Sequence, residues 1–111
     1  MATTMPDSAD GVLRDRTKRV LARFTASPGV TTEKYDEALK RLKTSGNQWP
    51  PDGLAYHMAF TSGGSFRVSE VWDSQEQFDA FGKRLMPILS DVGIELEGKP
   101  EMLEVHNVIQ R

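Results

Sequence analysis

A glutamate and a tryptophan at the end of the segment RVSEVWD have the chemistry and the spacing for a site inside an apolar pocket. Glu70 and Trp72 are two positions apart, so in an extended strand both side chains point to the same face. A carboxylate among apolar side chains is costly unless it is hydrogen-bonded or paired, and such burial raises the pKa of a glutamate toward that of a general base. Glu70 is therefore a predicted catalytic residue. A structural salt bridge with Arg23 or Arg67 is the alternative.

The histidines and the remaining aromatic residues extend this set. His57 and His106 are the only histidines in the sequence, and both are predicted to move a proton, although a histidine within a strand is more often structural. Trp72 can stack on a planar ligand or can be core, and Trp49, beside two prolines in a loop, fits a lid or an interface. The predicted substrate-binding residues are Trp72, Val68, Trp49, Tyr35 and Arg23.

The domain that must position these side chains is predicted to span residues 17–111, after a disordered polar tail at 1–16. Alternating hydrophobic residues predict strands in VLARFT, LAYHMAFT, FRVSEVWD and EMLEVHNVI. Helical periodicity predicts one helix in TTEKYDEALKRLK and another after Ser74, where the S-x-x-Q sequence is typical of a capping box. The elements follow one another in the order β-α-β-β-α-β.

The second strand has two distinct faces. Leu54, Tyr56, Met58 and Phe60 alternate with small residues and His57. A face of large apolar side chains is the kind that helices cover, so we predict that these four residues form core beneath the helices. The same alternation places His57 on the opposite face.

The order of elements predicts an α+β fold of the ferredoxin-like type. Right-handed crossovers then give an antiparallel sheet of order 4-1-3-2 with both helices on one face. The strands carry apolar residues on both faces, so the uncovered face is expected to pack on a second subunit and form a dimeric barrel. His57 and His106 lie on opposite edge strands, roughly 14 Å apart. They can share a site only if they converge between the two subunits of the dimer.

Composition excludes several classes of function. The 111 residues include 14 basic and 16 acidic side chains, so there is no basic surplus for nucleic acid. No apolar run is long enough to span a bilayer and the first residues are unlike a signal peptide, so we expect a cytoplasmic protein with no membrane partner. There are no cysteines, and the histidines lack the usual ligand spacings, so neither a metal nor another cofactor is expected. A site formed by both histidines and Glu70 is the alternative.

The chain beyond the tail resembles the dimeric α+β barrel superfamily, and within it the antibiotic biosynthesis monooxygenase-like branch. The segments that carry the resemblance are VLARFT, PGVTTEKYD, GLAYHMAF, EVWDSQEQFDAF and LEVHNVI. The most specific of them is the E-x-W-x-S-x-E-x-F pattern that begins at Glu70. The resemblance implies a homodimer whose members include cofactor-free monooxygenases, haem-degrading enzymes, isomerases and polyketide cyclases, so it indicates the fold more than the reaction.

Two departures from that family matter. Haem-degrading members combine an asparagine on the first strand with a histidine on the second helix, and this chain has neither residue there. Members that form quinones use an asparagine near the tryptophan, where this chain has Val68.

The function expected from these features is a small cofactor-independent enzyme of monooxygenase-like type that acts on a hydrophobic aromatic or polyketide-like molecule in a barrel pocket. The alternatives are an isomerase or cyclase on the same fold, or a non-catalytic homodimer that binds a small ligand or serves as a scaffold.

Overall fold

The computed structural model describes residues 19–45 and 48–111, and the predicted tail at 1–16 lies outside this part of the chain. Its elements appear in the predicted β-α-β-β-α-β order. The strands are β1 (Val20–Thr25), β2 (Leu54–Ser62), β3 (Ser65–Trp72) and β4 (Glu101–Glu104), and the helices are α2 (Thr32–Thr44) and α3 (Gln75–Val92).

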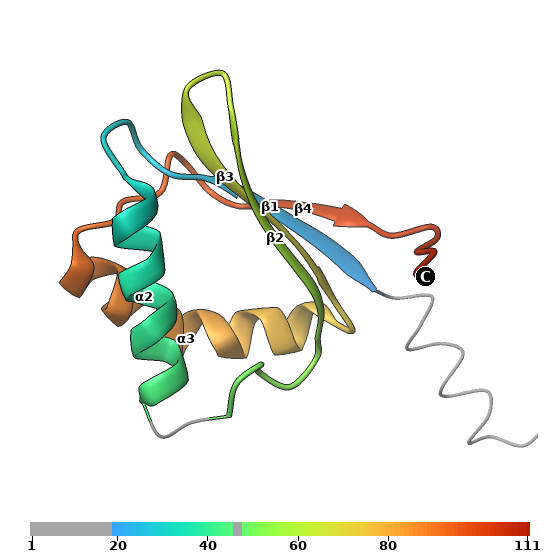
Figure 1. The fold of residues 1–111 in the computed structure, drawn as a ribbon. Helices are drawn as coiled ribbons and strands as arrows, with labels where there is room; N and C mark the ends of the chain where they lie inside the picture. The colour runs from blue at the N-terminus through green and yellow to red at the C-terminus, as the bar shows by residue number, and fades with distance from the viewer. Residues whose placement is uncertain (1–18, 46–47) are drawn as a thin grey trace, which may run out of the picture.

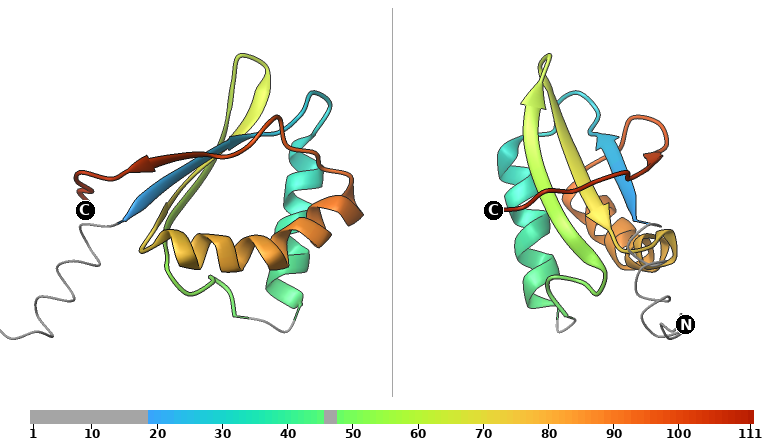
Figure 2. Two further views of the ribbon diagram at one scale, coloured as in Figure 1. Left: turned by 180° about the vertical axis from the view of Figure 1, so that it is seen from behind. Right: turned by 90° about the vertical axis from the view of Figure 1, so that its right-hand side faces the viewer.

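All strand pairs are antiparallel, and the sheet order is β2-β3-β1-β4. This is the predicted 4-1-3-2 order read from the opposite edge. Both helices lie on the same side of the sheet, and the other side is left without a helix (Figure 1). Views from behind and from the side show the same two layers (Figure 2). The chain thus has an α+β fold that is compatible with the ferredoxin-like type.

Both helices begin at a capping residue, and for α3 it is the predicted Ser74. The Thr31 hydroxyl accepts a hydrogen bond from the backbone N–H of Lys34 at 3.2 Å, and the Ser74 hydroxyl accepts one from the N–H of Gln77 at 3.2 Å. These bonds satisfy donors that the first turn of a helix leaves free. α3 ends at Gly93, whose φ of 79° is favourable for glycine because it has no Cβ.

The main core lies where the helices meet the sheet. Trp72 is fully buried there, packed with Ala22, Leu42 and Phe81. The Trp72 ring meets Phe78 edge-on at 5.8 Å and lies 5.4 Å from the ring of Phe81, both measured between centroids. Of the two readings of Trp72, the structure therefore supports core.

The prediction for the faces of β2 is wrong. Tyr56 and Met58 lie on the helix-free side and are 48% and 47% exposed, whereas His57 points toward the helices. The cause is a β-bulge between Leu54 and Tyr56, because Leu54 pairs with Trp72 while Tyr56 pairs with the very next residue of β3. One extra residue in a strand exchanges its two faces. Of the four residues predicted to form core, which are Leu54, Tyr56, Met58 and Phe60, Leu54 is the one that packs on the main core.

The fourth strand is shorter than expected. β4 ends at Glu104, so His106 lies beyond it and is exposed rather than within a strand. No helix within the described part of the chain is long and apolar enough to cross a membrane.

Candidate functional site

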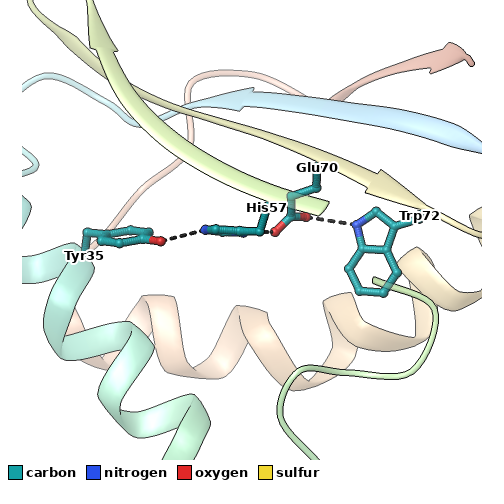
Figure 3. Close-up of polar contacts among 4 residues, drawn as sticks. All are labelled: Tyr35, His57, Glu70 and Trp72. Atoms are coloured by element: carbon teal, nitrogen blue, oxygen red, sulfur yellow. Dashed lines mark hydrogen bonds and ion pairs between the residues drawn. The ribbon is translucent and has the colours of Figure 1, made fainter. Parts of the chain in front are cut away.

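A chain of hydrogen bonds links α2 to β2 and β3 across the helix-covered face of the sheet (Figure 3). The Tyr35 hydroxyl lies 2.6 Å from Nε2 of His57, and Nδ1 of His57 lies 2.7 Å from Oε2 of Glu70. The other carboxylate oxygen of Glu70, Oε1, accepts a hydrogen bond from Nε1–H of Trp72 at 3.0 Å. Four side chains from three elements, α2, β2 and β3, thus form one polar row in an otherwise apolar layer.

The donors and acceptors in this row define where a neutral His57 carries its hydrogen. The Trp72 indole can only donate, and an ionised Glu70 can only accept, so Nδ1 of His57 must carry the hydrogen that Glu70 receives. That leaves a lone pair on Nε2, to which the Tyr35 hydroxyl donates. A neutral His57 in this row is therefore the Nδ1–H tautomer, and its Nε2 lone pair accepts the hydrogen of Tyr35.

The sheet register explains why these side chains meet. Glu70 is paired directly with His57 on β2 and with Ala22 on β1, so only a small side chain stands beside it on the β1 side. The side chain of Glu70 is only 4% exposed, and that of His57 is 24% exposed. The predicted alternative for Glu70, a salt bridge with Arg23 or Arg67, is wrong, because its partners are His57 and Trp72.

A cavity between the sheet and the helices adjoins the row. Tyr35, His57 and Glu70 are its polar lining, and apolar side chains form the rest of its wall. The cavity has a volume of about 60 Å³, or about 610 Å³ of empty space when its open mouth is counted. Since one water needs roughly 10 to 15 Å³, the cavity itself has room for a few waters, and a larger ligand would have to extend into the open mouth.

The structure brings some predicted site residues to this cavity and leaves others away from it. Val68, Trp49 and Tyr35 line it together with His57 and Glu70. Trp72 is buried behind it, where it contacts the lining residues Glu70 and Phe81.

Arg23 lies on the helix-free side of the sheet, where it faces Glu101 at 3.8 Å. His106 is exposed, and His57 points away from the face on which sheets would pair. A meeting of His57 with the partner's His106 through that face therefore does not fit the structure.

A scan against models of known protein families finds no match to this chain, and a search of the curated proteins finds none either. The likeness to the antibiotic biosynthesis monooxygenase-like branch is thus carried by the sequence motifs alone. The structure supports its coarser part, a four-stranded antiparallel sheet with two helices.

The contact between Tyr35 and His57 is the part of the site that sequence reasoning missed. The sequence feature that could have indicated this contact is the position of His57 between Ala55 and Ala59 on β2. Small neighbours on the same face leave space for a side chain from a helix to reach the histidine. Within the described residues, no three His, Cys, Asp or Glu side chains gather into a group that could hold a metal ion.

Burial raises the pKa of Tyr35 above its ordinary value of 10.0, and the charge of Glu70 adds to this rise. The Tyr35 hydroxyl therefore stays neutral at physiological pH and serves as a donor to His57. Because the folded-state pKa is the higher one, the unfolded chain loses the tyrosine proton first, and the stability supplied by Tyr35 is lost as the pH rises above 10.

We expect Tyr35→Phe to lower the free energy of unfolding at pH 7 by about 1 to 2 kcal/mol, because Nε2 of His57 loses its partner. The difference in unfolding free energy between Tyr35→Phe and the wild type should become smaller above pH 10, where the wild type loses the stability supplied by Tyr35. Urea unfolding of both proteins at several pH values measures it. As a direct check, Tyr56→Phe leaves Tyr35 as the remaining tyrosine of two, and the midpoint of its titration, followed by phenolate absorbance, should lie above pH 10. A midpoint at or below pH 10 would contradict the assignment.

Proposed function

We propose that the protein is a small cofactor-independent enzyme that removes a proton from a hydrophobic, aromatic or polyketide-like molecule bound in the cavity. The observation that carries the proposal is His57, held between Glu70 and Tyr35 with a lone pair on Nε2 beside an apolar cavity. A base positioned by a buried carboxylate is a recurring arrangement for general base catalysis.

Tyr35 conveys the proton in this mechanism. Its oxygen takes the substrate proton while its own hydrogen passes to Nε2 of His57 over 2.6 Å. The imidazolium formed is stabilised by Glu70, which Trp72 holds in place through its indole N–H. Since no charge remains on Tyr35, its raised pKa is compatible with a role as a neutral relay.

The fate of the deprotonated substrate defines the reaction class. In a monooxygenase-like reaction, an electron-rich carbanion reacts with O₂, and a CH₂ group becomes a carbonyl with release of one water. In an isomerase or cyclase, the same enolate is reprotonated or attacks a carbonyl. The likeness of the EVWDSQEQF segment to the monooxygenase-like branch favours the first reaction.

Proton removal can be tested before the substrate is known. Native mass spectrometry of freshly purified protein would reveal a retained small molecule. A panel of naphthols, anthrones and β-diketones would then be assayed in D₂O for exchange of the acidic C–H, and in an oxygen electrode. We expect exchange that His57→Ala abolishes, with oxygen uptake for the substrate of a monooxygenase.

The outcomes separate the alternatives. Exchange without oxygen uptake would indicate an isomerase or cyclase. A bound molecule that undergoes neither reaction, in wild type and His57→Ala alike, would leave a ligand-binding protein and refute the enzyme. His106→Ala serves as the matched control, because that histidine is exposed and away from the cavity.

We further propose that two subunits pair through the helix-free face of the sheet. Tyr56, Met58 and Leu103 expose 37% to 48% of their surface on this face, beside the apolar residues Leu21 and Val71. A sheet with one uncovered apolar face is stabilised when it packs on another layer, and two copies related by a two-fold axis supply one.

Met58→Asp should therefore yield a monomer at micromolar concentration, because the interface would bury a charge. Met86→Asp is the matched control. Met86 is 53% exposed, but lies on α3 at the other side of the molecule, so this variant should stay a dimer. Analytical ultracentrifugation measures both. A monomeric wild type, or a dimer unaffected by Met58→Asp, would refute the proposed interface.

A further inference from the structure

Glu70 places a negative charge on the wall of the apolar cavity. Among the described residues that line this cavity, Glu70 is the one acid, and none is a lysine or an arginine. Its side chain is 4% exposed, and its hydrogen-bond partners are the rings of His57 and Trp72. When His57 is neutral, no cation among these lining residues balances the carboxylate. The charge of Glu70 then acts on whatever occupies the cavity.

The same charge acts on the hydroxyl of Tyr35, which also lines the cavity. Burial is the largest cause of the raised pKa of Tyr35, and the negative charges of Glu70 and Asp36 add to the rise. An anion beside Tyr35 would meet both effects, because it would lose its hydration in an apolar cavity and would be repelled by the carboxylates. An uncharged ligand meets neither penalty.

Hydrogen bonding in the polar row selects among uncharged ligands. With His57 neutral, the Tyr35 hydroxyl donates to His57, while Nδ1–H of His57 and Nε1–H of Trp72 donate to Glu70. All three hydrogens are thus used within the row, and the Tyr35 oxygen keeps its lone pairs. The row therefore offers a ligand an acceptor and no free hydrogen. A ligand hydroxyl fits this arrangement, whereas an ether or a carboxylate oxygen does not.

We propose that the cavity takes its ligand as an uncharged molecule whose hydroxyl group donates a hydrogen bond to the Tyr35 oxygen, and that it discriminates against carboxylates and ethers. The hydroxyl lies at the polar row, and the rest of the molecule lies along the apolar wall and into the open mouth. This ligand class rests on the site of the proposed function. Binding needs no turnover, however, so the ligand class and the enzyme can fail separately.

Protonation of His57 would reverse both preferences. An imidazolium donates from Nδ1 to Glu70 and from Nε2 to the Tyr35 oxygen, so it balances the carboxylate and releases the Tyr35 hydrogen toward the cavity. The polar groups that face His57 are Tyr35 of α2 and Glu70 of β3, and the side chains of α3 on the cavity wall are apolar. A carboxylate should therefore bind together with a proton on His57, and more tightly as the pH falls.

The test compares three probes of nearly equal size in titrations of the full chain. Benzyl alcohol is uncharged and has a hydroxyl, its isomer anisole has only an ether oxygen, and benzoate is an anion. Methyl NMR spectra give each Kd and show whether the leucine, isoleucine and valine side chains of the cavity respond. At about pH 8.5, anisole should bind about fivefold more weakly than benzyl alcohol, and benzoate more than about tenfold more weakly.

The pH dependence is a second readout from the same titrations. Histidines commonly titrate between about pH 5 and 8, so the measurements are repeated down to about pH 6. Benzoate should gain affinity as the pH falls, with a slope that corresponds to the uptake of one proton. Benzyl alcohol can both donate and accept a hydrogen bond, so its Kd should change little.

Two variants test the residues responsible. Tyr35→Phe removes the acceptor, so benzyl alcohol and anisole should bind equally well. Glu70→Gln removes the charge, and its NH₂ group leaves His57 with its hydrogen on Nε2, which frees the Tyr35 hydrogen for a ligand. It should bind benzoate more than about tenfold more tightly than the wild type does. Glu37→Gln is the matched control, because it removes an exposed carboxylate from α2 and should leave the order of the probes unchanged.

Three results would overturn the proposed ligand class. They are wild-type binding of benzoate or anisole as tight as that of benzyl alcohol at about pH 8.5, a benzoate affinity that Glu70→Gln leaves unchanged, and methyl spectra that none of the probes alters at millimolar concentration. If the order of the probes holds while no candidate substrate exchanges its proton, the enzyme is refuted and the ligand class stands.

Discussion

Trp72→Ala is expected to lower the free energy of unfolding by about 3 to 5 kcal/mol, the range typical of a large aromatic residue removed from a packed core. Trp72 is fully buried, and it contacts the rings of Phe78 and Phe81. Its indole N–H is also a hydrogen-bond donor to Glu70, which would be left with one partner fewer. For a domain of this size such a loss is a large fraction of the total stability.

Urea unfolding followed by circular dichroism measures this effect at a fixed protein concentration. Trp49→Ala is the matched control, because Trp49 is only partly buried and its ring centroid lies 6.4 Å from that of Phe81. Trp49→Ala should lower the free energy of unfolding by less than half as much as Trp72→Ala does. If the two variants were equally stable, Trp72 would not be the centre of the core, and its role as a pocket wall would have to be reconsidered.

Glu70→Gln is expected to keep the fold but invert the hydrogen bonds along the polar row. The glutamine oxygen can still accept the Trp72 N–H, but its NH₂ group then faces Nδ1 of His57, where the carboxylate had accepted a hydrogen. His57 must respond by carrying its proton on Nε2, which then donates to the Tyr35 oxygen. The base loses the lone pair that the proposed mechanism needs.

The consequence is a large loss of activity with a small loss of stability. We expect the rate of proton removal to fall by roughly 10³ to 10⁴, as an inverted tautomer does in other carboxylate–histidine sites. The free energy of unfolding should fall by only about 1 to 2 kcal/mol, because within the row only the Tyr35 O–H loses its acceptor. Long-range ¹H–¹⁵N spectra of the imidazole report the tautomer directly.

Glu37→Gln is the control for removal of a carboxylate, since Glu37 forms an exposed ion pair with Arg41 and such pairs contribute little. It should change neither the tautomer nor the rate. An Nδ1–H tautomer that persists in Glu70→Gln would show that Glu70 does not set the protonation of His57, and the relay mechanism would fail with it.

Several features of this protein were determined by sequence alone. The cap at Ser74, the order of elements and the α+β class follow from local patterns, because capping and hydrophobic periodicity depend on residues a few positions apart. The burial of Glu70 beside Trp72 was predictable in the same way, from a spacing of two on one strand.

The partners of Glu70 were decided only by the tertiary structure. An inserted residue between Leu54 and Tyr56 exchanges the faces of β2, and a bulge of this kind leaves no mark in the alternation of large and small residues. That exchange turns His57 inward, onto the face where Glu70 and Tyr35 lie, and exposes Tyr56 on the other side. The residue types for the site can be found in the sequence, but strand register and the packing of α2 on the sheet decide which of them meet.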